Sequence, residues 1–133
     1  MLDQPRGPAL LDAVATLLRD VLLPQLQGNA AFQARVAANA VDLAAREMRL
    51  GPAADAAAAD RLQALLQHDG PPDALEAELA LAIRSGAIDD QAAALRAHLW
   101  ASTLDKLAID QPSYAPYRRA VQLRAGPTPT PQE

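Results

Sequence analysis

The 133-residue chain contains no cysteine, which excludes disulfide bonds, cysteine-ligated zinc and thiol catalysis. Its length predicts one domain, which we place at residues 1–125, followed by a disordered tail at residues 126–133. A net charge of -4 argues against a general nucleic-acid binder.

The N-terminus lacks a basic segment followed by an apolar run, and no run of 18 apolar residues occurs. We therefore expect neither a signal peptide nor a membrane partner, and a cytoplasmic location. Aromatic residues make up only 3% of the chain, so the core is expected to consist of leucine, valine and alanine.

The first predicted helix opens at Gly7 and Pro8, because proline suits the first position of a helix. Its apolar face consists of Leu10, Val14, Leu17, Leu18, Val21 and Leu22. Pro24 is expected to end or kink this helix. Gly28 and Asn29 are predicted to form the turn into the second helix.

Residues 32–50 carry the clearest two-faced pattern of the chain. At about 100° per residue, one helical stripe holds Phe32, Val36, Ala40, Leu43 and Leu50. This spacing predicts a helix packed on the core. Gly51 and Pro52 are expected to end it.

Glu47 falls in the middle of that apolar stripe. A buried carboxylate without a partner would cost several kcal/mol. We therefore expect Glu47 to meet a cation, to be protonated, or to lie where the helix end opens to solvent. Arg84 and Lys106 are the candidate cations, although the helix dipole alone would also favour them where they stand.

A polar row lies beside the stripe. It consists of Arg35, Asn39, Asp42, Arg46 and Arg49. Asp42 precedes Arg46 by four residues, the favourable order for a helical ion pair. Three interpretations remain open for this row: a solvated flank, a polar network that fixes an interface or lines a groove, and a catalytic row.

Four further helices are predicted by their apolar faces and by the breakers between them. They cover residues 53–67, 73–83, 89–109 and a short segment that begins at Pro116. The first three are separated by a predicted break at residues 68–72 and by the stop signal Ser85-Gly86. No strand-like alternation occurs. The predicted fold is an all-α, single-domain bundle of about five helices with a short extra C-terminal helix.

Common catalytic and metal motifs are missing from the sequence. Neither His68 nor His98 follows an acidic residue by three positions, and no H-E-x-x-H sequence occurs. His98 and Ser102 are expected to form a helical surface pair, and His68 a favourable contact with a helix C-terminus. We predict no metal, no cofactor and no catalytic residue.

Two aromatic and basic features allow both a structural and a functional interpretation. Trp100 is expected in the core, with a stacking platform for a ligand as the alternative. Tyr114 and Tyr117 stand beside a basic patch, which is either a solvated tail helix or a contact for an anion or RNA. The patch consists of Arg118, Arg119 and Arg124.

Four segments carry a family resemblance: LLDAVATLLRDVLLPQL, RVAANAVDLAARE, LALAIRSGAID and LDKLAIDQPSYA. Together they resemble a small bacterial domain of unknown function, over about residues 1–115. Its members are encoded beside aminoglycoside-phosphotransferase-like and acyl-CoA-dehydrogenase-like proteins. The resemblance implies acyl-CoA or organic acid metabolism with a kinase-like partner, and no catalytic residues. It also implies that five residues occupy recurrent polar positions: Arg35, Asn39, Arg46, Glu47 and Arg84.

Two functions follow as hypotheses. The first is a non-enzymatic accessory or regulatory domain that binds a phosphotransferase-like protein and self-associates. The second is a small ligand-binding protein or enzyme that grips a phosphate or carboxylate. The candidate interaction residues are Arg35, Asn39, Asp42, Arg46, Glu47, Arg84 and Lys106. The acidic balance disfavours a third hypothesis, a nucleic-acid regulator.

Overall fold

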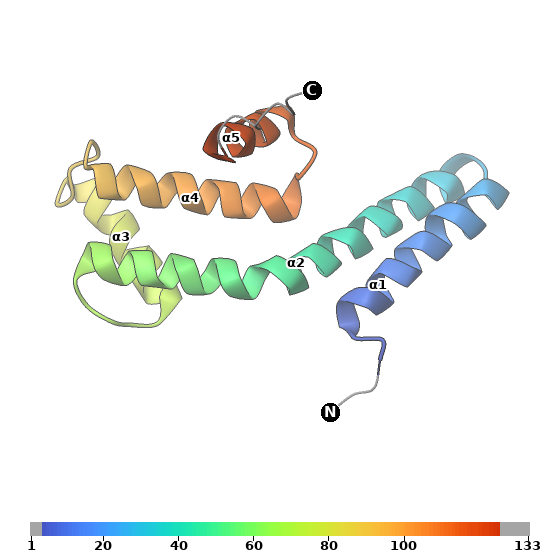
Figure 1. Cartoon of the computed structure of the whole chain (residues 1–133), viewed down its shortest axis with the longest axis horizontal. Coiled ribbons are helices and arrows are strands. Elements are labelled where there is room, and N and C mark those ends of the chain that lie inside the picture. Colours follow the sequence, from blue (N-terminus) through green and yellow to red (C-terminus); the bar gives the residue numbers. More distant parts are fainter. Residues whose placement is uncertain (1–3, 126–133) are drawn as a thin grey trace, which may run out of the picture. The chain divides into compact units, whose positions relative to one another are not determined.

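The computed structural model describes residues 4–125 (Figure 1). Within them lie five α-helices and no strand: α1 (Gly7–Thr16), α2 (Gly28–Leu66), α3 (Pro72–Ser85), α4 (Ala93–Asp110) and α5 (Ala115–Ala125). A π-helix (Leu17–Leu22) and a 3-10 turn (Leu23–Gln25) follow α1. The predicted all-α fold with a short last helix is confirmed. The predicted disordered tail, 126–133, lies outside the described residues.

Backbone contacts divide the chain into two compact units, Met1–Pro52 and Ala53–Glu133. The division falls where Gly51 and Pro52 predicted the end of a helix. That predicted end is wrong, because α2 continues through Pro52. An internal proline removes one backbone hydrogen bond, and the alanine-rich segment that follows has the highest helix propensity available to offset this loss. Among residues 4–125, no helix is long and apolar enough to cross a membrane.

The first unit is an antiparallel pair of helical segments. Gly28 adopts the left-handed region, with a φ of 57°, and starts α2 after the turn. Ion pairs join Asp12 to Arg49 near one end and Arg19 to Asp42 farther along, so α1 and its continuation run beside the first part of α2 (Figure 1). The buried residues described in this unit are all alanine or glycine: Ala15, Ala31, Ala34, Ala38, Ala45 and Gly51.

Ten large apolar residues of the first unit are exposed instead, and five others, Leu11, Leu18, Leu23, Val41 and Leu43, are half-buried. The exposed ones are Leu10, Val14, Leu17, Val21, Leu22, Leu26, Phe32, Val36, Met48 and Leu50. The stripe that predicted a core face on α2 is therefore on the outside, with Phe32 60% and Val36 50% exposed. The prediction is wrong because helix separation depends on the side chains at the contact, and α2 presents its alanines to α1.

The second unit has a leucine core from three helices. Leu62 of α2, Leu75 and Leu79 of α3, and Leu95 of α4 form one buried cluster. Gly86 ends α3 in the left-handed region, with a φ of 74°, as the Ser85-Gly86 signal predicted. The break predicted at residues 68–72 lies between α2 and α3, and its last residue, Pro72, begins α3.

The apolar residues of α4 differ in burial. Leu95 and Leu104 are buried, as expected for core residues. Trp100 is 58% exposed, so its predicted core role is wrong. The helix α5 packs on α4, but it leaves Trp100 partly exposed in a groove that residues of both helices line.

The buried alanines between the helical segments of the first unit, here called the alanine seam, predict how a larger side chain affects stability. The seam consists of Ala15, Ala31, Ala34, Ala38 and Ala45. Ala38 is fully buried, so Ala38→Leu should overpack the seam and lower the free energy of unfolding by about 1–3 kcal/mol. The matched control is Ala37→Leu at an exposed neighbouring position, which should change the free energy of unfolding by about 0.5 kcal/mol or less. Urea unfolding followed by circular dichroism measures both. Equal effects at the two positions would contradict the seam.

Candidate functional site

The polar row of α2 forms part of the helix pair in the first unit. The Arg19 guanidinium donates to Asn39 Oδ1 at 3.2 Å and pairs with the carboxylate of Asp42. Its hydrogen bond to Asp42 raises the pKa of Arg19 further above its usual value. Arg49 pairs with Asp12 and donates to the Pro8 carbonyl at 3.3 Å. Three residues of the row thus join α2 to the preceding helical segment.

The other candidates of the first unit are not buried. Arg35 and Glu47 are exposed, and Arg46 is half-buried. Of the three outcomes considered for Glu47, the structure shows exposure to solvent, because the stripe that contains Glu47 faces outward. The carboxylate therefore needs no cation to compensate for lost hydration.

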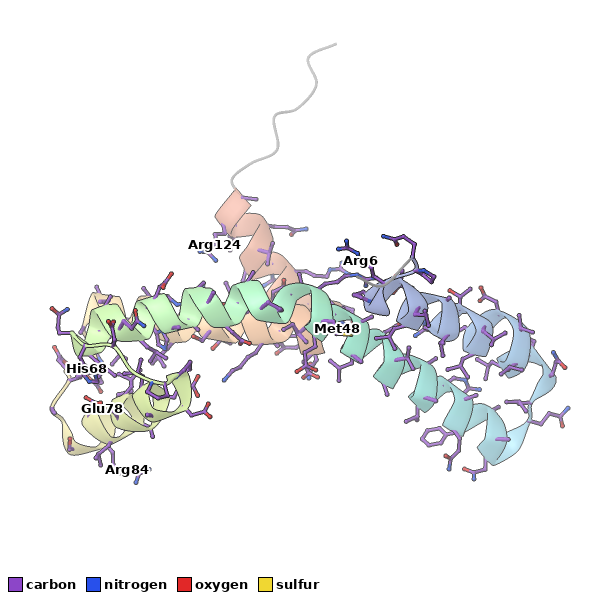
Figure 2. The ribbon with its side chains drawn as sticks, turned by 90° about the horizontal axis from the view of Figure 1, so that it is seen from below. Arg6, Met48, His68, Glu78, Arg84 and Arg124 are labelled. Atoms are coloured by element: carbon purple, nitrogen blue, oxygen red, sulfur yellow. The ribbon has the colours of Figure 1, made fainter. Side chains whose placement is uncertain are left out.

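The two cations considered for Glu47 belong to the second unit. Arg84 is exposed in the last turn of α3 (Figure 2), and Lys106 is exposed on α4. The helix-dipole interpretation suits Arg84, which lies at the C-terminal end of its helix. An ion pair of Glu47 with either residue stays a prediction.

Arg61 is the centre of a polar cluster in the second unit. From α2 it reaches three side chains of α4. Its guanidinium donates to His98 Nδ1 at 3.4 Å, to Ser102 Oγ at 3.4 Å and to Asp105 Oδ2 at 3.2 Å. The pair with Asp105 supplies the opposite charge, and Arg61 is 27% exposed. One half-buried cation therefore cross-links two helices next to the leucine core.

His98 is buried inside this cluster, not on the surface as expected. Burial lowers the pKa of His98 below its usual 6.5, and the positive charge of Arg61 lowers it further. Because Nδ1 accepts from Arg61, the neutral ring carries its proton on Nε2. The expected His98–Ser102 pair is replaced by a shared contact with Arg61.

Arg61 was not among the residues predicted from the sequence, although a polar stripe on α4 pointed to a partner for that stripe. His98, Ser102 and Asp105 recur at i, i+4 and i+7, so they form one polar stripe on α4. A polar stripe on a helix that is apolar on its other sides requires hydrogen-bond partners from a neighbour. Arg61, one residue before the buried Leu62, was a candidate for that partner.

A hollow next to the Arg61 cluster is acidic. It encloses about 100 Å³ and is lined by Asp55, Glu76, Ser102, Asp105 and Lys106. A larger hollow of about 410 Å³ shares Asp55 and Glu76 and adds Asp73. No group of residues within 4–125 is placed to hold a metal ion. The carboxylates oppose binding of an anion in either hollow.

His68 has a specific partner beyond the helix C-terminus that predicted its role. Its Nε2 lies 3.0 Å from both carboxylate oxygens of Glu78 on α3, and the two side chains meet in Figure 2. The hydrogen bond to Glu78 raises the pKa of His68, and one to the Asp69 carbonyl adds to the increase. The two histidines of the chain are therefore shifted in opposite directions.

Replacing the central cation should disrupt the cluster. Arg61→Met leaves Asp105 and His98 without their donor, so we expect a loss of about 1–2 kcal/mol in unfolding free energy, since Asp105 is partly hydrated. The pKa of His98 should also rise toward 6.5. The control Arg96→Met, at an exposed position of α4, should leave both nearly unchanged. An unaltered His98 pKa in Arg61→Met would rule out the contact.

NMR can test whether the pKa values of the two histidines are shifted in opposite directions, because the chain has only two histidines. His68 should titrate above pH 6.5 and His98 below it. The His98 contribution to stability is complete above 6.5 and is lost as pH falls through its folded pKa. The His68 contribution is complete below 6.5 and is lost as pH rises through its folded pKa. Glu78→Gln should move only His68 toward 6.5; both rings titrating on one side would contradict the assignment.

Comparison with known proteins identifies the family. Residues 24–114 match the model of a family described as domain of unknown function (DUF6285). No curated protein and no solved structure matches the chain. The matched segment runs from the turn before α2 to the residue before α5, and it contains the Arg61 cluster and the polar row of α2. Because it covers more than half of the sequence, the chain belongs to the DUF6285 family.

Proposed function

We propose that the chain is a non-enzymatic accessory or regulatory domain that binds another protein through its first unit. The supporting observation is that small residues are buried in this unit while large apolar residues are exposed. Alanines fill the seam, and ten large apolar side chains are exposed. Exposed apolar groups in this number are typical of an interaction surface.

The outer stripe of α1 and its π-helical continuation has the spacing of a helix-packing seam. Leu10, Val14, Leu17 and Val21 follow one another at steps of four, three and four residues, and each is 40–48% exposed. This is the a/d spacing of helices that pack side by side. The adjacent stripe, with the buried Ala15, already faces α2, so the outer stripe has no covering helix within the first unit.

We assign the partner from the family resemblance described above. It is a phosphotransferase-like protein that acts in acyl-CoA or organic acid metabolism. A second copy of the chain is the other occupant considered, which would make a homodimer. The candidate residues Arg35 and Glu47 are exposed on α2 and are available for polar contacts at the rim of such an interface.

The alternative, an anion-binding protein or enzyme that uses the polar row, receives less support. Asn39 and Asp42 already accept hydrogen bonds from Arg19, and Arg49 already pairs with Asp12. These contacts lie within the helix pair. A ligand at this row would have to displace those contacts and compete with the carboxylate of Asp42.

The proposal is tested with purified proteins. The chain should co-elute at micromolar concentration with a phosphotransferase-like protein encoded beside it. The double variant Val14→Asp/Leu17→Asp should weaken binding at least tenfold, because charges would enter the apolar contact. The control Leu81→Asp changes a residue that is 62% exposed on α3 and should bind normally.

Three measurements separate the outcomes. Circular dichroism checks that each variant keeps its helix content. Light scattering of the chain alone reports the homodimer. Failure to co-elute, or equal weakening by the α1 and α3 variants, would contradict the proposal.

A further inference from the structure

A groove opens where α5 packs on α4 in the second unit. It encloses about 410 Å³ and is lined by Trp100, Pro116, Arg119, Ala120, Leu123 and Arg124. Ligand pockets in proteins commonly enclose roughly 300–1,000 Å³. The indole of Trp100 is 58% exposed and forms part of the apolar wall. A flat aromatic surface is thus open to solvent in a chain with few aromatic residues.

The charges of this groove are all positive. Arg119 and Arg124 both line it, and no acidic residue among residues 4–125 does. Arg124 lies in the last turn of α5 (Figure 2). Within residues 4–125, neither guanidinium has a side-chain hydrogen bond or an ion pair, whereas Arg19, Arg49 and Arg61 are all engaged. Two free guanidinium groups beside an indole provide donors without acceptors.

We propose that this groove binds a free nucleotide. The base would stack on the indole of Trp100, as bases do on aromatic side chains. The phosphates would accept hydrogen bonds from Arg119 and Arg124, since the planar guanidinium matches phosphate oxygens in a bidentate manner. An inorganic anion would leave the indole unused, and an uncharged aromatic molecule would leave the guanidinium groups unused. A nucleotide uses both.

This site is independent of the protein-interaction proposal, which concerns α1 in the first unit. It also lies partly outside the family match, which ends at residue 114, before α5 begins. Arg119 and Arg124, on α5, therefore lie outside the segment that the family model matches. The acidic hollow lined by Asp55 and Glu76 lies elsewhere in the same unit and would not attract the same ligand.

The experiment uses the fluorescence of Trp100 as its reporter, because the 133-residue chain contains a single tryptophan. The fluorescence of the chain, excited at the red edge of the indole band, is titrated with ATP, adenosine and tripolyphosphate in parallel. Saturable quenching by ATP is expected. Adenosine and tripolyphosphate should each bind at least tenfold more weakly, because each lacks one half of the ligand.

Variants locate the site. Arg119→Gln/Arg124→Gln should weaken ATP binding at least tenfold, whereas Arg118→Gln, an exposed neighbour on α5 outside the groove, should leave it unchanged. Trp100→Leu, followed by calorimetry, should also weaken it at least tenfold while tripolyphosphate binding stays as it was. Circular dichroism verifies that each variant is folded.

Three results would overturn the proposal. The first is no saturable quenching at millimolar ATP. The second is equal weakening by Arg118→Gln and by the groove variant, which would indicate non-specific attraction to a basic helix. The third is tripolyphosphate binding as tightly as ATP, which would mean that the indole takes no part.

Discussion

Alanine at the contact between α1 and α2 fixes which side chains of the first unit can be buried. Small residues at a helix contact permit a close approach, and each buries little apolar surface. Ten of the larger apolar residues then remain exposed, and the others that the structure describes in this unit are half-buried. Ion pairs at Asp12–Arg49 and Arg19–Asp42 bridge the two segments and fix their register. The exposed apolar surface is thus a direct consequence of how the helix pair is built.

The second unit differs from the first because its buried core consists of large apolar side chains. Leucines from α2, α3 and α4 meet in its interior, and one arginine satisfies the polar stripe of α4. Burial lowers the pKa of His98, and Asp105 supplies the charge opposite to that of Arg61. Stability is lost above pH 6.5 because the pKa of His68 is raised, and it is lost below pH 6.5 because the pKa of His98 is lowered. This unit therefore has its stabilising contacts inside, and its candidate ligand groove on the surface between α4 and α5.

Helix boundaries could be predicted wherever a local breaker controls the chain. Gly86 and the Pro71-Pro72 step determine the ends of α3 through their own backbone preferences, so sequence reasoning found them. Pro52 was misread because a strong helix former on its C-terminal side allows α2 to continue. Local preference alone could not show which effect prevails.

Burial was harder to predict than helicity. Periodicity identified the stripe of Phe32 and Val36 as apolar, but it could not show that the alanines beside it make the contact. The same error assigned Trp100 to the core. Arg61 was missed because its three partners lie on a helix more than thirty residues away, and only the tertiary packing brings them together.

Thiol labelling tests the inverted packing of the first unit most directly, since the natural chain has no cysteine to interfere. Val14→Cys and Ala38→Cys are made separately and reacted with a maleimide under native conditions, with each unfolded protein as its reference. The structure predicts rapid labelling at position 14, close to the unfolded rate, and strong protection at position 38. Protection at position 14 together with rapid labelling at position 38 would contradict an alanine seam with an apolar exterior.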